Sequence, residues 1–284
     1  MDITQAKTFL TIVELRNFNK AAEKLFVTQS TVSARVKALE QQLGCVLFVR
    51  NKAGVTLTPA AMRFETPAQS IVQLWDHAKK EIALGEQITQ SITIGARFGL
   101  WEPLMLDWLL RLKEEFPNSV FNAKIGTASS LIQKMHNGTM DLCLVYSPYT
   151  NTGLKVKKLF DEQFVMVSTH ARKTDKIPAD YIYVDWGTEF ARKHKLHFPD
   201  FSNAMLSANL GALAQSLISK TGGMGYLPYR TASKAIKKGE LVIIEGMPLM
   251  TLPVFMIYSE LIDPETLHFI EHSLLEHCKT FDRL

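Results

Sequence analysis

Residues 17–40 constrain the fold of this chain more than any other segment, because they predict two short helices joined by a tight turn. Thr28 can cap the second helix by accepting a backbone N–H, and Ala21 and Ala22 in the first helix let the two helices cross closely. Apolar residues recur in the second helix at spacings of four, three and four, which predicts a buried stripe. The stripe comprises Val32, Val36, Leu39 and Leu43.

The other faces of the second helix carry short polar and basic side chains. Such side chains are small enough to approach base edges or charged enough to reach phosphates, so this helix suits a DNA major groove. An ordinary α-hairpin with a solvated polar face is the alternative interpretation. The candidate DNA-contacting residues of the helix are Gln29, Ser30, Thr31, Ser33, Arg35 and Lys37.

The distribution of charge favours DNA binding. The whole chain carries a net charge of +4, from 32 Lys and Arg against 28 Asp and Glu. Residues 1–58 contain eight bases and four acids, so they account for the entire excess and the rest of the chain is balanced. Positive charge concentrated on the helix pair is what binding to a polyanion requires, because phosphate contacts release counterions.

Two further elements are predicted after the helix pair. Residues 46–58 indicate a small β-hairpin, a wing that would carry Arg50 and Lys52 toward the DNA backbone or the minor groove. A proline that follows Thr58 then opens a long helix to about residue 84, in which Pro67 should cause a kink or a break. An apolar seam in this helix suits pairing with a second copy, although packing within its own domain is the alternative. The seam comprises Ile71, Trp75, Ala78 and Ile82.

Three motifs in the first 50 residues match a known pattern. The pattern F-x-x-A-A-x-x-L-x-[VL]-[ST]-Q-[SP]-x-[VL]-S begins at Phe18, L-E-x-x-L-G begins at Leu39, and L-F-x-R begins at Leu47. With these motifs, residues 1–64 resemble the LysR-type transcriptional regulators, a family of DNA-binding proteins. The DNA contacts that the resemblance implies fall on Gln29, Ser30, Thr31, Ser33, Arg35 and Arg50.

Two positions depart from the family pattern. Ala53 stands where a second wing arginine is usual, and Ala61 stands where the family has the glycine of L-T-x-A-G. Lys52 is the candidate replacement for the missing wing charge.

From residue 89 onward, predicted strands and helices alternate, which implies a parallel sheet. Strands are expected at 91–95, 120–125 and 140–146, with helices at 102–115 and 129–137. Residues 159–168 indicate a crossing into a second lobe, and the segments at 222–228 and 239–244 resemble the second-lobe pattern of the family.

The resemblance therefore covers essentially the whole chain and implies an α/β protein with three parts. Residues 1–58 form a winged helix-turn-helix DNA-binding domain, and residues 59–88 form a linker and dimerisation helix. Residues 89–284 form a two-lobed α/β effector domain that resembles type 2 periplasmic binding proteins. Lobe I covers about 89–160 and 262–284, and lobe II covers about 161–261.

Within the family, residues 100–102 and 184–190 resemble segments of the HdfR-like branch. Both segments contain a tryptophan, Trp101 and Trp186. We expect these rings to anchor the core more than to stack on a ligand.

The resemblance implies a small-molecule effector between the lobes, near strand ends and helix N-termini, where clefts are natural ligand sites. Arg97 could pair with a carboxylate ligand, or it could be a surface or salt-bridged residue. The family often has small hydroxyl residues after the first strand and at the position of Ala128, and this chain departs from both. The candidate lining comprises Arg97, Phe98, Gly99, Thr127, Ala128, Ser129, Tyr146, Ser147 and Ser207.

An enzyme and a non-specific architectural DNA binder are the competing classes, the first because two-lobed α/β domains also host catalysis. His194 and His197 lack acidic or cysteine partners at metal-ligand spacing. The glycine-rich residues 222–225 lack the context of a phosphate loop, so a close-packed turn is expected there. We expect no catalytic residue, no metal and no cofactor, apart from the small-molecule effector.

Three features bear on cell location and partners. No apolar run approaches the 18 residues that a membrane span needs, and the N-terminus does not have the pattern of a signal peptide, which favours the cytoplasm and no membrane partner. Cys45, Cys143 and Cys278 are widely spaced, which favours reduced thiols over redox sensing. The expected partners are double-stranded promoter DNA, a second copy of the chain in a dimer or a dimer of dimers, and RNA polymerase.

Overall fold

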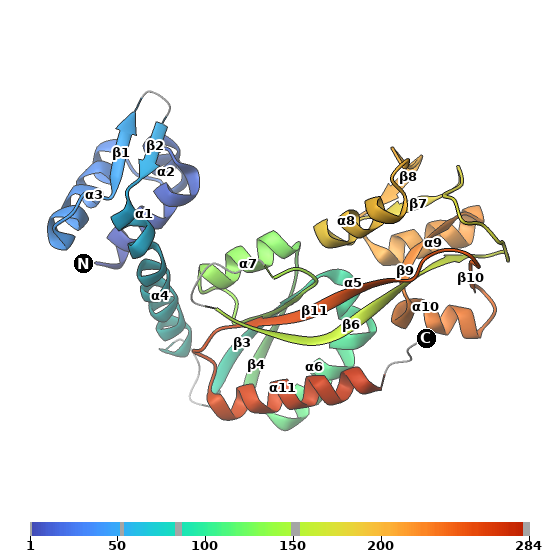
Figure 1. The fold of residues 1–284 in the computed structure, drawn as a ribbon. Helices are drawn as coiled ribbons and strands as arrows, with labels where there is room; N and C mark the ends of the chain where they lie inside the picture. The colour runs from blue at the N-terminus through green and yellow to red at the C-terminus, as the bar shows by residue number, and fades with distance from the viewer. Residues whose placement is uncertain (1, 52–53, 83–86, 149–153, 281–284) are drawn as a thin grey trace. The chain divides into compact units, whose positions relative to one another are not determined.

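The computed structural model describes residues 2–51, 54–82, 87–148 and 154–280 (Figure 1). The chain divides into two compact units, one centred on residues 1–87 and one that contains most of the chain from residue 88 onward. None of the helices within the described ranges is long and apolar enough to cross a membrane.

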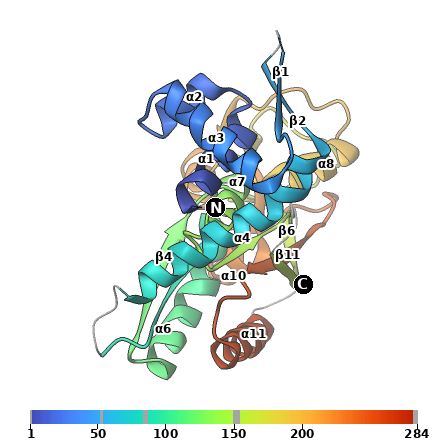
Figure 2. The ribbon, with the colours of Figure 1, turned by 90° about the vertical axis from the view of Figure 1, so that its left-hand side faces the viewer.

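The N-terminal unit is a winged helix-turn-helix. Its elements are α1 (Ile3–Leu15), α2 (Phe18–Lys24), α3 (Gln29–Leu43), β1 (Phe48–Asn51), β2 (Gly54–Leu57) and α4 (Pro59–Ile82). Asp2, Asn17 and Thr28 cap the first three helices through side-chain oxygens, so the cap predicted at Thr28 is confirmed. The two wing strands pair antiparallel and extend away from the helices (Figure 2).

Aromatic rings fill the core of this unit between the helices and the wing. The ring of Phe48 lies 5.4 Å from that of Phe9 on α1 and 5.8 Å from that of Phe18 on α2. The predicted stripe of α3 is buried except for Leu43, which is 40% exposed. That part of the prediction was wrong because Gly44 ends the helix in the left-handed conformation one residue later, and the chain turns away from the core.

A kink or a break was predicted at Pro67, and the break does not occur, because α4 continues through this residue. Pro67 removes the helical partner of the Arg63 carbonyl. Both residues are exposed, so water can bind the carbonyl in place of the missing N–H. The start of the helix is as expected, because the Thr58 hydroxyl accepts from the backbone N–H of Ala61 at 3.1 Å.

The second unit is built on one mixed sheet with the strand order β10-β6-β11-β5-β3-β4, and β9 pairs with β6. Three strands, β3 (Gln90–Ala96), β4 (Ser119–Ile125) and β5 (Leu142–Val145), are parallel, as predicted. The long strands β6 (Lys155–Ser168) and β11 (Met250–Tyr258) are antiparallel to their neighbours. The remaining strands of this unit are β7 (Ile182–Val184), β8 (Leu206–Ala208), β9 (Met224–Pro228) and β10 (Val242–Ile243).

We call β3, β4 and β5, with α5 (Phe98–Leu100), the π-helix η1 (Trp101–Met105), α6 (Leu106–Glu115), α7 (Ala128–His136) and α11 (Pro264–Lys279), the first lobe. The second lobe contains β7 to β10, with α8 (Thr188–His197), α9 (Gly211–Thr221) and α10 (Tyr229–Lys237). Strands β6 and β11 run from one lobe into the other, as Figure 1 shows. The predicted crossing at 159–168 is therefore part of β6.

The helix predicted at 102–115 begins late. Glu102 has extended dihedral angles (φ −107°, ψ 131°), and the regular helix α6 starts only at Leu106. The cause is Pro103, which disfavours the helical conformation of the residue before it. The sequence already contained this signal.

The glycine-rich segment is closely packed, as predicted, but the turn comprises only Gly222 and Gly223, because Gly225 belongs to β9. Gly222 ends α9 in the left-handed conformation, with φ at 73°. A Cβ at Gly223 would lie 2.6 Å from the Asp180 carbonyl oxygen, and a Cβ at Gly225 would lie 2.9 Å from that of Ile182. Only glycine allows so close an approach of the two backbones.

His194 lies in the core of the second lobe and is 2% exposed. Its Nε2 is 3.0 Å from the Tyr181 hydroxyl, and its ring packs against those of Phe198 and Phe201. Burial lowers the pKa of His194 to about 4, and His197 adds to that shift. His197 itself is exposed, and the described part of the chain contains no group of three or more metal-ligating residues.

The buried His194 predicts a loss of stability in mild acid. Its pKa is lower in the folded chain than in the unfolded chain, so its contribution is complete above pH 6.5 and disappears as the pH falls toward 4. Between pH 7 and pH 5 this loss is about 2 kcal/mol. Urea denaturation of wild type and His194→Phe at both pH values measures it. An equal loss in the two proteins would contradict this origin of the acid sensitivity.

Candidate DNA-binding surface and effector cleft

Several of the predicted DNA-contacting residues lie close together at the start of α3. The Gln29 amide donates to the Ser33 hydroxyl at 2.9 Å, which holds the amide along the helix. The Thr28 hydroxyl lies 2.8 Å from those of Ser30 and Thr31. The bond to Ser33 uses one amide hydrogen of Gln29, and the remaining amide hydrogen and the oxygen have the pattern that pairs with an adenine edge.

The structure describes the side chains of only two of the four basic residues predicted to contact DNA. Lys37 is exposed on α3, and Arg35 is half-buried and donates to the Thr8 hydroxyl on α1 at 3.4 Å. Arg50 belongs to β1, and its side chain lies outside the described part of the structure, as does the whole of Lys52.

Glu40 holds the wing against α3, a role that the sequence analysis missed. Its Oε1 accepts from the backbone N–H groups of Leu47 at 2.7 Å and Phe48 at 3.3 Å. Thr58 closes the other side of the hairpin, because its hydroxyl donates to the Val46 carbonyl at 2.8 Å. The signal was present in the L-E-x-x-L-G motif, which places a carboxylate one turn before the helix ends.

The predicted pairing seam of α4 lies largely exposed in the single chain. Trp75 is 49% exposed and Ile82 is 85% exposed, while Ile71 is also exposed and Ala78 is half-buried. Leu74, which was not part of the prediction, extends the apolar surface. The face of α4 that packs on its own domain is a different one and comprises Ala61, Ala68 and Val72.

A cleft of about 360 Å³ opens in the second unit where the end of β5, the start of α8 and β11 meet. This volume suits a small ligand. Two of the predicted effector residues, Tyr146 and Ser147, line it. The other lining residues are Pro148, Thr188, Glu189, Arg192, Pro253 and Phe255.

The polar part of the cleft is an ion pair on α8. The Arg192 guanidinium donates twice to the Glu189 carboxylate, at 2.7 and 3.0 Å. This bond lowers the pKa of Glu189. The cleft therefore offers one positive and one negative group, beside apolar surface from Pro253 and Phe255.

The predicted residues 97–99 are not among the residues that line this cleft, and the turn that they form packs against the second lobe. Arg97 donates through Nη2 to the Asp185 carbonyl at 2.8 Å, so this nitrogen already has a partner from the second lobe. A Cβ at Gly99 would lie 2.8 Å from the Trp186 ring. This turn therefore contacts the second lobe directly.

The remaining predicted effector residues also lie away from the cleft. Thr127 and Ser129 are exposed, and their hydroxyls are 3.1 Å apart at the start of α7, next to the half-buried Ala128. Ser207 is exposed on the short strand β8.

Both tryptophans are core anchors, as expected. Trp186 is buried and donates from its indole nitrogen to the Tyr226 carbonyl at 2.9 Å. Trp101 is buried and donates to the Lys124 carbonyl at 3.0 Å. Neither residue lines the cleft.

A winged helix-turn-helix joined to a two-lobed domain with a cleft defines a class of ligand-responsive transcriptional regulators, and the comparisons agree. Residues 3–62 match the bacterial regulatory helix-turn-helix protein model of the lysR family, and residues 85–277 match the LysR substrate binding domain. The chain is 31% identical over 278 residues to the HTH-type transcriptional regulator HdfR of Yersinia enterocolitica, covering 94% of both chains.

Two solved structures share the fold. Full-length OxyR from Pseudomonas aeruginosa, in a variant form, matches with a TM-score of 0.61 at 19% identity, over 100% of this chain and 98% of that one. Full-length LysG from Corynebacterium glutamicum with bound effector Arg matches with a TM-score of 0.61 at 17% identity, over 100% of both chains. The chain belongs to the LysR family of transcriptional regulators and is similar to HdfR.

The Glu40 contacts predict a test of the wing. Glu40→Ala removes the acceptor of two backbone N–H groups, so the wing loses its anchor and affinity for the chain's own upstream DNA should fall about tenfold. Glu40→Gln keeps an acceptor oxygen and should stay within about threefold of wild type. Fluorescence anisotropy measures both variants. Wild-type affinity in Glu40→Ala would show that the wing does not depend on this carboxylate.

Proposed function

We propose that this chain is a promoter-specific regulator that binds DNA as a homodimer or a dimer of dimers and responds to a small molecule in the cleft. We assign DNA binding to residues 1–58, pairing to 59–88 and the response to 89–284. The observation that carries the proposal is the polar, outward face of α3, whose opposite side is anchored in the core of the N-terminal unit.

In this proposal α3 enters the major groove. Gln29, Ser30, Thr31 and Ser33 read base edges, and Arg35 and Lys37 contact the groove or the phosphates. Arg50 and Lys52 of the wing supply further backbone or minor-groove contacts. Lys52 replaces the second wing arginine, which is usual in the family at the position of Ala53. Phosphate contacts supply most of the affinity and the groove contacts supply specificity.

Two copies are needed because one short recognition helix contacts few bases. The exposed seam on α4 supports pairing, because an isolated apolar helix face of this kind is stabilised by burial against a second copy. A symmetric pair would place two α3 helices in successive major grooves of an inverted repeat.

The cleft is proposed as the effector site. It has the volume of a small-molecule site, and the related LysG structure was solved with bound effector Arg. Binding would change the geometry of the lobes and thereby the spacing of the DNA-binding domains. Because its proposed target is promoter DNA, we place the protein in the cytoplasm, with RNA polymerase as a further partner.

The competing classes have less support. An architectural DNA binder needs no effector cleft, whereas this chain has one. An enzyme is disfavoured because the charged groups of the cleft are paired with each other, and the curated relatives are named as transcriptional regulators.

Substitutions on α3 and on the wing should separate specificity from affinity. Gln29→Ala should reduce the preference for the promoter over random DNA by about tenfold, because a base-edge contact is worth 1–3 kcal/mol. Arg50→Ala should weaken binding to all sequences and lower the slope of log K against log salt by about one. Anisotropy titrations at several salt concentrations measure both effects. Equal losses on promoter and random DNA in both variants would refute this division.

The seam on α4 predicts the behaviour of a dimer variant. Trp75→Ala should raise the dimer dissociation constant about 30-fold, because a half-exposed tryptophan on such a face is typical of a binding hot spot. Ser70→Ala changes an exposed residue of the same helix outside the seam and should have no effect. Analytical ultracentrifugation measures both variants. The seam has no role in pairing if the two variants dissociate alike.

A further inference from the structure

A buried ion pair lies on β6, the strand that runs from one lobe of the second unit into the other. Arg230, at the start of α10 in the second lobe, donates to the Glu162 carboxylate through Nε at 3.1 Å and through Nη2 at 2.7 Å. Both side chains are 3% exposed. Burial pulls the pKa of Arg230 down, but Glu162 outweighs that effect and leaves the pKa above its ordinary value. The guanidinium is therefore held in its charged form, and both side chains are shielded from solvent.

The same guanidinium reaches across to the first lobe. Arg230 donates to the Gly99 carbonyl through Nη2 and to the Glu102 carbonyl through Nη1, both at 2.9 Å. The helical partner of Gly99 would be the N–H of residue 103, which is a proline and has none. Glu102 is in the extended conformation, and its usual partner, the Leu106 N–H, donates to the Trp101 carbonyl instead. Arg230 thus satisfies two carbonyls that Pro103 leaves without helical partners.

Tyr146 connects this pair to the cleft. Its hydroxyl donates to Glu162 Oε2 at 3.1 Å, and Tyr146 is one of the residues that line the cleft. Glu162 therefore holds Arg230 on one side and Tyr146 on the other, so a change at the cleft reaches the contact between the lobes through one carboxylate.

We propose that Arg230 and Glu162 form a buried latch that holds the two lobes together, and that Tyr146 is the positioning residue through which an occupant of the cleft acts on the latch. The part concerning the occupant rests on the proposed effector function. The latch itself does not, because it requires neither DNA nor ligand. A broken buried pair leaves an uncompensated charge, so loss of the latch should open the lobes markedly.

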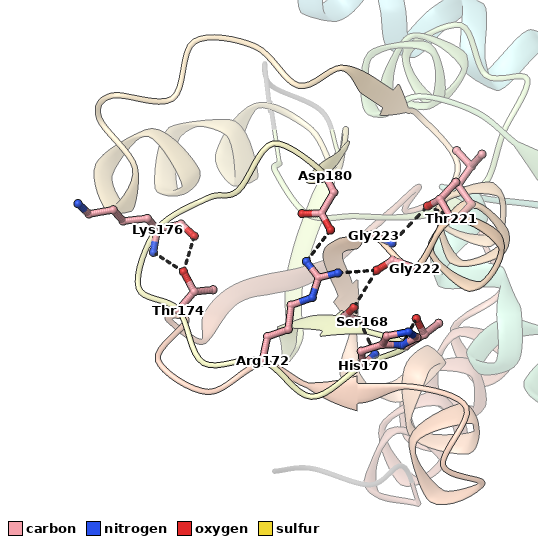
Figure 3. Close-up of polar contacts among 11 residues, drawn as sticks. Ser168, His170, Arg172, Thr174, Lys176, Asp180, Thr221, Gly222 and Gly223 are labelled. Carbon is pink, nitrogen blue, oxygen red and sulfur yellow. Dashed lines mark hydrogen bonds and ion pairs between the residues drawn. The ribbon is translucent and has the colours of Figure 1, made fainter.

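The chain offers a matched control within one lobe. Arg172 also donates to a carboxylate, that of Asp180, and to a backbone carbonyl, that of Gly222 at 3.0 Å (Figure 3). All three residues belong to the second lobe. Arg172→Lys therefore alters a similar set of bonds without touching the contact between the lobes.

Hydrogen exchange of the full-length protein, without DNA or ligand, tests whether the latch holds the two lobes together. Arg230→Lys keeps the charge but loses the planar fork, and it should speed the exchange of residues 97–105 about tenfold, whereas Arg172→Lys should leave it unchanged. Tyr146→Phe removes one of the donors to Glu162 and should speed the exchange of residues 97–105 about threefold. If Arg230→Lys and Arg172→Lys exchange alike, the latch is refuted.

A second variant covers the case in which Arg230→Lys does not fold. Glu162→Gln combined with Arg230→Met removes both charges, so no buried charge is left unpaired. It should fold and show the fast exchange at 97–105. Distances between spin labels at Glu114→Cys and Lys220→Cys, two exposed sites in opposite lobes, should also broaden relative to wild type, all in a Cys45→Ser background. Wild-type exchange and distances in the folded double variant would overturn the latch.

A covalent probe tests the role of Tyr146. Ser147→Cys, in the same Cys45→Ser background, is modified with methyl methanethiosulfonate, which places a small adduct in the cleft beside Tyr146. The adduct should speed exchange at 97–105 at least threefold, and its removal with dithiothreitol should restore the original rate. In a Tyr146→Phe background the adduct should no longer change the exchange rate. An adduct without effect, or one that acts equally without the hydroxyl, refutes the positioning role. Failure of the proposed function is seen separately, as loss of promoter preference in wild type.

Discussion

Burial of one apolar stripe on α3 decides which face of that helix meets the solvent, and the DNA-binding surface depends on this. Val32, Val36 and Leu39 pack into the core of α1, α2 and the wing, so the polar residues of α3 must lie on the other side. The Thr28 cap sets the start of the helix, and the Glu40 carboxylate sets the position of the wing beside it. Side chains separated in sequence thereby form one surface.

The second unit joins two lobes, with a cleft at the end of β5. Strands β6 and β11 give a continuous backbone connection through both lobes. Side chains then add contacts at one turn of the first lobe, where Gly99 meets Trp186 and its carbonyl accepts from Arg230. A continuous sheet with a few specific contacts beside it is suited to two discrete arrangements of the lobes.

The local features of the fold were predictable because short-range physics determines them. The cap at Thr28, the parallel strands and the close-packed turn at Gly223 follow from residue type and spacing. The late start of α6 was also readable from Pro103, through its effect on the residue before it. The exposure of Leu43 was missed because periodicity alone does not locate the end of a helix.

The residues that line the cleft were predicted only in part, because they come from segments that are far apart in the sequence. Tyr146 and Ser147 follow a predicted strand, and position alone identified them. Glu189 and Phe255 belong to α8 and β11, whose approach to that strand end depends on how the sheet crosses from lobe to lobe. The contact of Arg97 with the Asp185 carbonyl was not predicted, because no pattern in the sequence shows that the second lobe supplies this partner.

The central claim is that the N-terminal unit binds specific duplex DNA. The most direct measurement is the affinity of the purified chain for its own upstream DNA and for a scrambled duplex of equal length, with and without residues 1–58, at physiological salt. The full chain should prefer the upstream DNA by about 10³-fold or more, and the truncated chain should bind neither duplex. Equal affinity of the full chain for both duplexes, or retained binding after the truncation, would contradict the claim.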